Sequence, residues 1–207
     1  MALISVSNNA LSNISAVPAS IPTGSLTLIK SITASSSASI EFINGTDGVV
    51  LDGTYSSYVF KFIDIHPQTN AVLFEFNISS DNGVNYNVVK TTIAFRTLHN
   101  ESDSTTALTY MLGDDLAQST SWQTLSIANI GNDADQTLVG TFTLYNPSST
   151  TYVKHFISNC HLYTHDDFAY SAYVAGYGNT TSAINAIKFQ LNSGNIDEGI
   201  IKLYGVK

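Results

Sequence analysis

The chain of 207 residues is poor in cysteine, proline and charge: it has one cysteine, four prolines and only 12% charged residues. The lone Cys160 excludes an intramolecular disulfide framework. Eight Lys and Arg against sixteen Asp and Glu give a net charge of −8, so the basic face needed to bind nucleic-acid phosphates is not expected. No apolar run approaches the roughly 20 residues of a membrane-spanning helix. These shortages point away from disulfide-rich, nucleic-acid-binding and membrane-inserted proteins.

Small polar and aromatic residues are abundant instead. The chain has 26 Ser, 22 Thr and 18 Asn, together with 11 Tyr and 10 Phe, and 43% of its residues are hydrophobic. A disordered acidic tail would lack such hydrophobic content. The composition therefore predicts a folded domain, and one domain of about 200 residues is ordinary for an all-β protein.

Residues 1–24 differ from the rest because they carry no charge and hold two of the prolines, Pro18 and Pro22. No Lys or Arg precedes Lys30, so the positive region of a secretory signal is missing and synthesis in a cytoplasm is expected. We interpret 1–24 as an N-terminal docking arm and 25–207 as the body; a frayed terminus is the alternative. The apolar residues expected to dock are Leu3, Ile4, Val6, Leu11, Ile14 and Val17.

The body consists of short runs rich in β-branched and aromatic residues, separated by turn residues such as Asn44-Gly45 and Asn146-Pro147. Sustained helical periodicity is missing; the nearest approaches are 104–118 and 180–188. We therefore predict an antiparallel, jelly-roll-like β-sandwich. The predicted strands are 25–33, 38–43, 57–66, 71–79, 87–97, 137–146, 151–164, 170–179, 183–192 and 198–207.

Period-two alternation assigns side chains to faces in several runs. In 57–65, Tyr58, Phe60, Phe62 and Asp64 are expected on one face, and Ile65 on the other. Within 151–164, Cys160 and His161 are expected on opposite faces. The thiol is then a buried, inert group without a histidine partner, and no catalytic residue is predicted.

No metal or cofactor is predicted. His155 and His161 are six residues apart, about 20 Å along a strand, so they cannot share one ion without a chain reversal. His161, His165 and Asp166 could do so only at a turn. Half of the acids gather in loop-like segments, where surface solubility is the favoured role, calcium binding the next and glycoside hydrolysis the last. These acids are Glu101, Asp103, Asp114, Asp115, Asp133, Asp135, Asp166 and Asp167.

The strongest binding signal is a group of aromatic residues interleaved with polar ones between 161 and 179. Tyrosine rings beside Asp, Asn and His suit a glycan-binding face or a protein interface. The alternative is that each ring fills the sandwich or covers a sheet. The predicted glycan- or partner-binding residues are Tyr163, His165, Asp166, Asp167, Tyr170, Tyr173 and Tyr177.

A further set of segments covers most of the chain: 5–24, TASSSASI (33–40), FIDIHP (62–67), LYNPSST (144–150), AGYGNTT (175–181) and 193–205. Together these segments resemble a family of marine and aquatic bacteriophage virion structural proteins. The resemblance implies a non-enzymatic, tail-fibre-like component of the particle surface, made in the host cytoplasm and assembled into the virion. It also implies a homo-oligomer, with a trimer as the usual arrangement, whose partners are other virion proteins.

The resulting hypothesis is a virion surface protein anchored by its N-terminal arm and serving as a tail fibre or adhesin. A capsid decoration protein and a carbohydrate-binding receptor module are the alternatives. A glycosidase that uses two of the loop acids is a third reading. No nucleic acid and no membrane insertion are expected.

Overall fold

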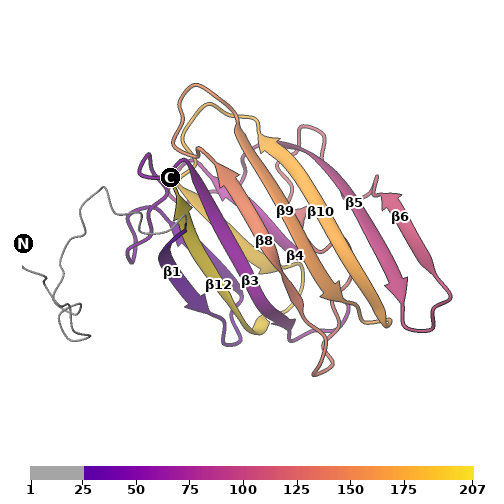
Figure 1. Cartoon of the computed structure of the whole chain (residues 1–207). Helices are drawn as coiled ribbons and strands as arrows, with labels where there is room; N and C mark the ends of the chain where they lie inside the picture. The colour runs from indigo at the N-terminus through magenta and orange to yellow at the C-terminus, as the bar shows by residue number, and fades with distance from the viewer. Residues whose placement is uncertain (1–25) are drawn as a thin grey trace, which may run out of the picture.

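The computed structural model describes residues 26–207, which form twelve β-strands in two antiparallel sheets and contain no helix (Figure 1). Within that range there is accordingly no helix that could cross a membrane. The strands are β1 (Thr27–Thr33), β2 (Ser39–Ile43), β3 (Ser57–Pro67), β4 (Phe74–Ser79), β5 (Lys90–Asn100), β6 (Thr106–Tyr110), β7 (Gln123–Thr124), β8 (Leu138–Tyr145), β9 (Lys154–Tyr163), β10 (Phe168–Gly178), β11 (Ala186–Leu191) and β12 (Ile196–Val206).

The strand order identifies a jelly roll. The large sheet has the order β1-β12-β3-β8-β9-β10-β5-β6, and the small sheet has β2-β11-β4-β7. If β5, β6, β9 and β10 are left out, eight strands remain: β1, β2, β3, β4, β7, β8, β11 and β12. Renumbered 1 to 8 in this order, they lie in the orders 1-8-3-6 in the large sheet and 2-7-4-5 in the small sheet. These are the two sheets of a jelly roll. The predicted jelly-roll-like sandwich is confirmed, while the predicted arm, 1–24, lies outside the described residues.

Two inserted hairpins widen the large sheet beyond the jelly roll. The hairpin β5–β6 follows β4, the hairpin β9–β10 follows β8, and β10 pairs with both β9 and β5. Figure 1 shows these four strands continuing the sheet past β8. We call β9, β10, β5 and β6 the extension. Part of its inner side is covered by the segment 111–136, where Ser119 and Lys90 exchange backbone hydrogen bonds of 2.7 and 3.0 Å.

Phenylalanine fills the space between the two sheets of the jelly roll. Phe189 of β11 is central, because its ring centroid lies 5.1 to 6.4 Å from those of five other phenylalanines. Most of these contacts are edge-to-face, which suits the ring quadrupoles. The five partners, from β2, β3, β4 and β8, are Phe42, Phe60, Phe62, Phe74 and Phe142.

A β-bulge in β3 breaks the predicted alternation. Tyr58, Phe60 and Phe62 share one face, as expected, and that face is buried, but Asp64 is exposed with a φ of 49°, and Ile65 is fully buried. The face assignment of Asp64 and Ile65 was therefore wrong, because the extra residue shifts the register with β8 between Phe62 and Ile65. Gly199 of β12 faces the bulge with a φ of 132°, and a Cβ there would lie 2.8 Å from the Asp64 carbonyl oxygen.

The two segments nearest to helical periodicity hold strands and loops. The first, 104–118, contains β6, and the second, 180–188, is a loop that runs into β11. Neither β6 nor the two-residue β7 was predicted. Every residue of β6 is exposed, so it has no buried face to create an alternating pattern.

Candidate contact surface

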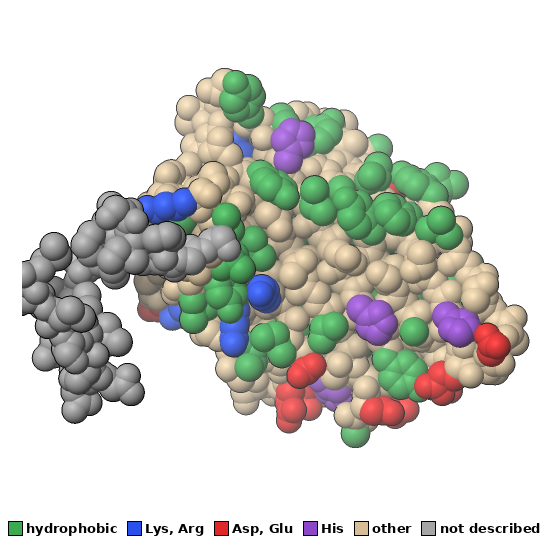
Figure 2. All heavy atoms as spheres, in the orientation of Figure 1, with side chains coloured by type: hydrophobic (Ala, Val, Ile, Leu, Met, Phe, Trp, Pro, Cys, Tyr) green, Lys and Arg blue, Asp and Glu red, His purple; other side chains and the backbone are tan. Residues whose placement is uncertain are grey.

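The solvent side of the large sheet, which we call the outer face, has no second layer of protein within the described residues. Sheet pairing aligns residues of neighbouring strands into rungs that run across this face. Figure 2 views it directly and shows apolar side chains in a band over the extension. Basic side chains lie toward β1 and β12, and acidic ones gather along the edge where the hairpins turn.

One rung is apolar at six of seven positions. Three of its residues are large and well exposed: Leu28 at 53%, Ile93 at 48% and Ile157 at 39%. We call this set the apolar rung. Across β1, β12, β3, β8, β9, β10 and β5 it consists of Leu28, Tyr204, Val59, Thr143, Ile157, Ala175 and Ile93.

The neighbouring rung has cations at one end and aromatic rings at the other. Lys61 and Lys202 face each other across β3 and β12, and no carboxylate among residues 26–207 lies within salt-bridge distance of either. At the far end, Phe95 and Tyr173 stack with centroids 4.7 Å apart. We call this set the mixed rung. From β12 to β6 it consists of Lys202, Lys61, Thr141, Asn159, Tyr173, Phe95 and Tyr110.

A shallow hollow of about 430 Å³ lies over the extension on the apolar rung. Ala175 belongs to its lining, together with the larger side chains Ile93, Ile157, His155 and Tyr177. The small methyl group between larger neighbours leaves room for a side chain from another molecule. Because its lining is largely apolar, the hollow suits an apolar or aromatic group.

The structure separates the predicted binding residues into three groups. Tyr173 and Tyr177 lie on the outer face near the hollow, and Tyr163 lies on the same face at the opposite end of the extension. Tyr170 has the opposite parity and is buried on the inner side, where the Arg96 guanidinium lies 4.7 Å from its ring centroid. The remaining three are exposed in the β9–β10 turn: His165, Asp166 and Asp167.

A polar hollow of about 340 Å³ surrounds Tyr163. The Tyr163 hydroxyl donates to Asp167 Oδ1 at 3.1 Å. Partial desolvation, followed by hydrogen bonds to the carboxylates of Asp167 and Glu101, raises the pKa of Tyr163, so the phenol stays protonated. His99, Asn100 and His161 complete a lining that offers hydrogen-bond donors and acceptors beside one aromatic ring.

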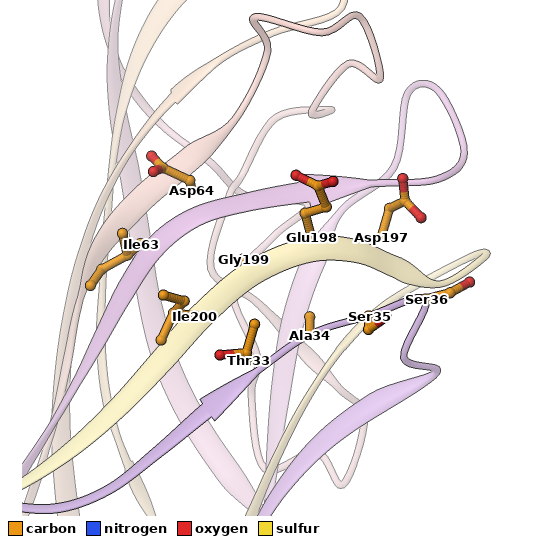
Figure 3. Close-up of a pocket in the computed structure, with 10 residues that line it drawn as sticks. All are labelled: Thr33, Ala34, Ser35, Ser36, Ile63, Asp64, Asp197, Glu198, Gly199 and Ile200. Atoms are coloured by element: carbon orange, nitrogen blue, oxygen red, sulfur yellow. The ribbon is translucent and has the colours of Figure 1, made fainter.

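A third hollow, of about 590 Å³, lies at the β3 bulge. Figure 3 shows the carboxylates of Asp64, Asp197 and Glu198 directed to the same side of the β12 ribbon. Asp64 and Glu198 are exposed, so solvent surrounds these carboxylates.

Cys160 is enclosed in the core, as predicted. Its side chain is 1% exposed, burial raises the pKa of the thiol to about 12, and His161 lies on the other face. Among residues 26–207, no three His, Cys, Asp or Glu side chains converge in a way that could hold a metal ion.

Two lysines are also buried, on either side of Gly178 in the sheet. Lys90 Nζ donates to Asn77 Oδ1 at 2.6 Å and to the Val88 carbonyl at 3.0 Å. Lys154 Nζ donates to the carbonyls of Tyr152 at 2.7 Å and Thr180 at 3.3 Å. All four acceptors are neutral. Burial lowers the pKa of both amines, that of Lys90 to about 8.

Most of the outer-face residues were not predicted as binding residues from the sequence. Ile93, Phe95 and Ile157 lay in predicted strands, but alternation alone does not say which of two faces is buried. Tyr110 lay in the unpredicted β6. The lysines 61 and 202 become neighbours only through the pairing of β3 with β12.

No protein-family model, no curated protein and no solved structure matches the chain. The outer face is therefore interpreted from its own residues.

Proposed function

We propose that the chain is a non-enzymatic structural protein on the surface of a bacteriophage particle, and that it works by contact through its outer face. The observation that carries the proposal is the apolar rung, which crosses seven strands without a covering layer in the described part of the chain. Exposed apolar surface of this kind marks interaction sites. A rigid sheet presents such a surface with little loss of conformational entropy.

Two further points support the proposal. The first is the resemblance of segments such as TASSSASI (33–40) and LYNPSST (144–150) to bacteriophage virion structural proteins, which is an expectation from the sequence alone. The jelly roll recurs in viral capsid domains, although it also occurs in lectins and cupins, so the fold is support by analogy. In this proposal the chain is a tail fibre or adhesin component, the residues 1–24 dock it on a neighbouring virion protein, and capsid decoration is the alternative position.

Purified particles test the proposal. Mass spectrometry should find the chain in particles separated from lysate, and antibodies raised against 26–207 should label intact particles at their surface. A chain that is abundant in infected-cell lysate and missing from purified particles contradicts it. Label on the tail or on the shell decides between fibre and decoration.

Deletion of residues 1–24 tests the docking arm. The truncated chain, supplied in trans with the full-length chain as the control, should fold and fail to enter particles. Equal incorporation of the two chains would show that another part of the protein provides the attachment.

The polar hollow around Tyr163 supports a second candidate, a carbohydrate-binding receptor module. An aromatic ring beside His99, His161 and Glu101 offers both ring stacking and hydrogen bonds to a sugar. Titration of host-surface polysaccharide should show binding that Tyr163→Ala weakens at least tenfold. Tyr145→Ala is the matched control, because Tyr145 is 41% exposed on β8 and does not line the hollow. No binding by the unaltered chain would exclude this candidate.

A further inference from the structure

The two rungs of the outer face are self-complementary. The apolar rung has the large Tyr204 two strands to one side of β8 and the small Ala175 two strands to the other. The mixed rung has its lysines at one end and its aromatic rings at the other. A half-turn about an axis that runs along the strands exchanges the two ends of each rung.

We propose that a second copy of this chain covers the outer face, related to the first by a two-fold axis that runs along the strands over β8. Tyr204 of each copy then enters the hollow over Ala175 of the other. Lys202 of each copy then lies over the Tyr173 ring of the other copy, and Lys61 lies over Asn159. This inference names the partner of the contact surface and rests on the proposed function.

Charge favours the two-fold arrangement over one in which the lysine ends of the two copies lie on top of each other. The cross-strand lysines repel each other in one copy, since like charges directly opposite are unfavourable. The opposite end of the mixed rung carries no Lys or Arg and holds the rings of Tyr173, Phe95 and Tyr110. The two-fold separates the lysine pairs of the two copies and places Lys202 of each copy over the Tyr173 ring of the other, whose face attracts cations.

The size of the face also fits a stable pair. Seven strands spaced about 4.8 Å apart span roughly 30 Å, and six residues along each strand span about 20 Å. One copy would then bury on the order of 600–700 Å², or about 1,200–1,400 Å² in total. Specific interfaces start at about 1,200 Å². Side chains from two such sheets can interdigitate as they do in a β-sandwich.

Sedimentation equilibrium on the full chain tests the pairing. The expected mass is twice the chain mass of 22.2 kDa, and Ile93→Lys should weaken self-association at least 100-fold. Val84→Lys is the matched control: Val84 is 78% exposed in the β4–β5 loop, away from the outer face, so this variant should remain paired. A monomer or a trimer overturns the inference, and so does a dimer that Ile93→Lys leaves intact.

Disulfide trapping tests the axis itself. A chain with both Tyr204→Cys and Ala175→Cys should form cross-linked dimers under mild oxidation, while Val84→Cys should not. The native Cys160 does not interfere because it is buried. Lack of cross-linking in a chain that dimerises would overturn this geometry. If the chain is monomeric but present in purified particles, the pairing fails while the proposed function stands.

Discussion

The two halves of the large sheet are held against the rest of the molecule in different ways. In the jelly-roll half, β3 and β8 face the small sheet across phenylalanine rings. In the extension, Phe156 of β9 also contacts Phe76 of the small sheet, but the inner side in addition carries buried polar groups, including Lys90, Thr92 and Lys154. Thr92 Oγ1 donates to Gln123 Oε1 at 2.6 Å, and Gln123 Nε2 donates to the Asp114 carbonyl at 2.7 Å.

This difference shows how one sheet can combine two kinds of stabilisation. Aromatic packing is non-directional and tolerates small shifts, whereas a buried polar network depends on every partner being present. The segment that covers the extension is mostly loop, so its backbone groups need partners that strands would otherwise provide. Side chains such as Thr92 and Gln123 supply them.

The largest expected effect is in the jelly-roll half. Phe189→Ala removes the ring that contacts five others, and we expect a loss of about 3–5 kcal/mol in the free energy of unfolding, because a cavity remains. Urea unfolding followed by intrinsic fluorescence measures it. Tyr152→Ala, at a side chain that is 69% exposed, should change the same quantity by no more than about 0.5 kcal/mol. A loss below about 1 kcal/mol for Phe189→Ala would show that this core does not depend on its central ring.

The next effect is a pH dependence in the extension. The pKa of Lys90 is about 8 in the folded chain against an ordinary 10.5, so between these values the unfolded chain binds more protons and stability rises with pH. From pH 7 to pH 10.5 the wild type should gain about 3 kcal/mol relative to Lys90→Met. Urea unfolding of both chains across this range measures the difference, in which the other titrating groups largely cancel. A pH-independent difference would contradict the buried, lowered-pKa amine.

The smallest effect concerns a single hydroxyl. Thr92→Val keeps the shape of the side chain but removes the donor to Gln123 and the acceptor of the Leu116 N–H, which lies 2.7 Å away. The Gln123 side-chain oxygen and the Leu116 N–H are then left unpaired, which should lower the free energy of unfolding by about 1–3 kcal/mol. Thr141→Val, exposed on the outer face, is the control and should be within about 0.5 kcal/mol of wild type. Equal values for the two variants would remove the distinction between the halves.

The jelly-roll half was predictable from the sequence because its strands alternate cleanly. In β3 alternation placed Tyr58, Phe60 and Phe62 on one face, and the structure buries that face. The individual strand pairs were not predictable beyond the jelly-roll-like class, since a pair such as β1 with β12 joins residues from opposite ends of the chain. The bulge at Asp64 was missed because one inserted residue leaves no trace in composition.

The extension was harder to predict because its residues contradict the usual rules. Lysine is almost never fully buried, so nothing in the sequence marks Lys90 and Lys154 as core residues. In the candidate surface, alternation could have separated Tyr170 from Tyr173 and Tyr177. It could not have shown which of them faces solvent, because that depends on the segment 111–136 that covers the other side.

The two edges of the large sheet differ in their protection. β1 carries Lys30 and an irregular register between Leu28 and Lys30, and both features hinder the addition of another strand. In the described part of the chain β6 pairs only with β5, and Thr106–Tyr110 contains neither lysine nor proline. Its outer backbone groups therefore form an open template for strand addition, so any tendency of the concentrated protein to form fibrils should start at β6, and a lysine placed there should suppress it.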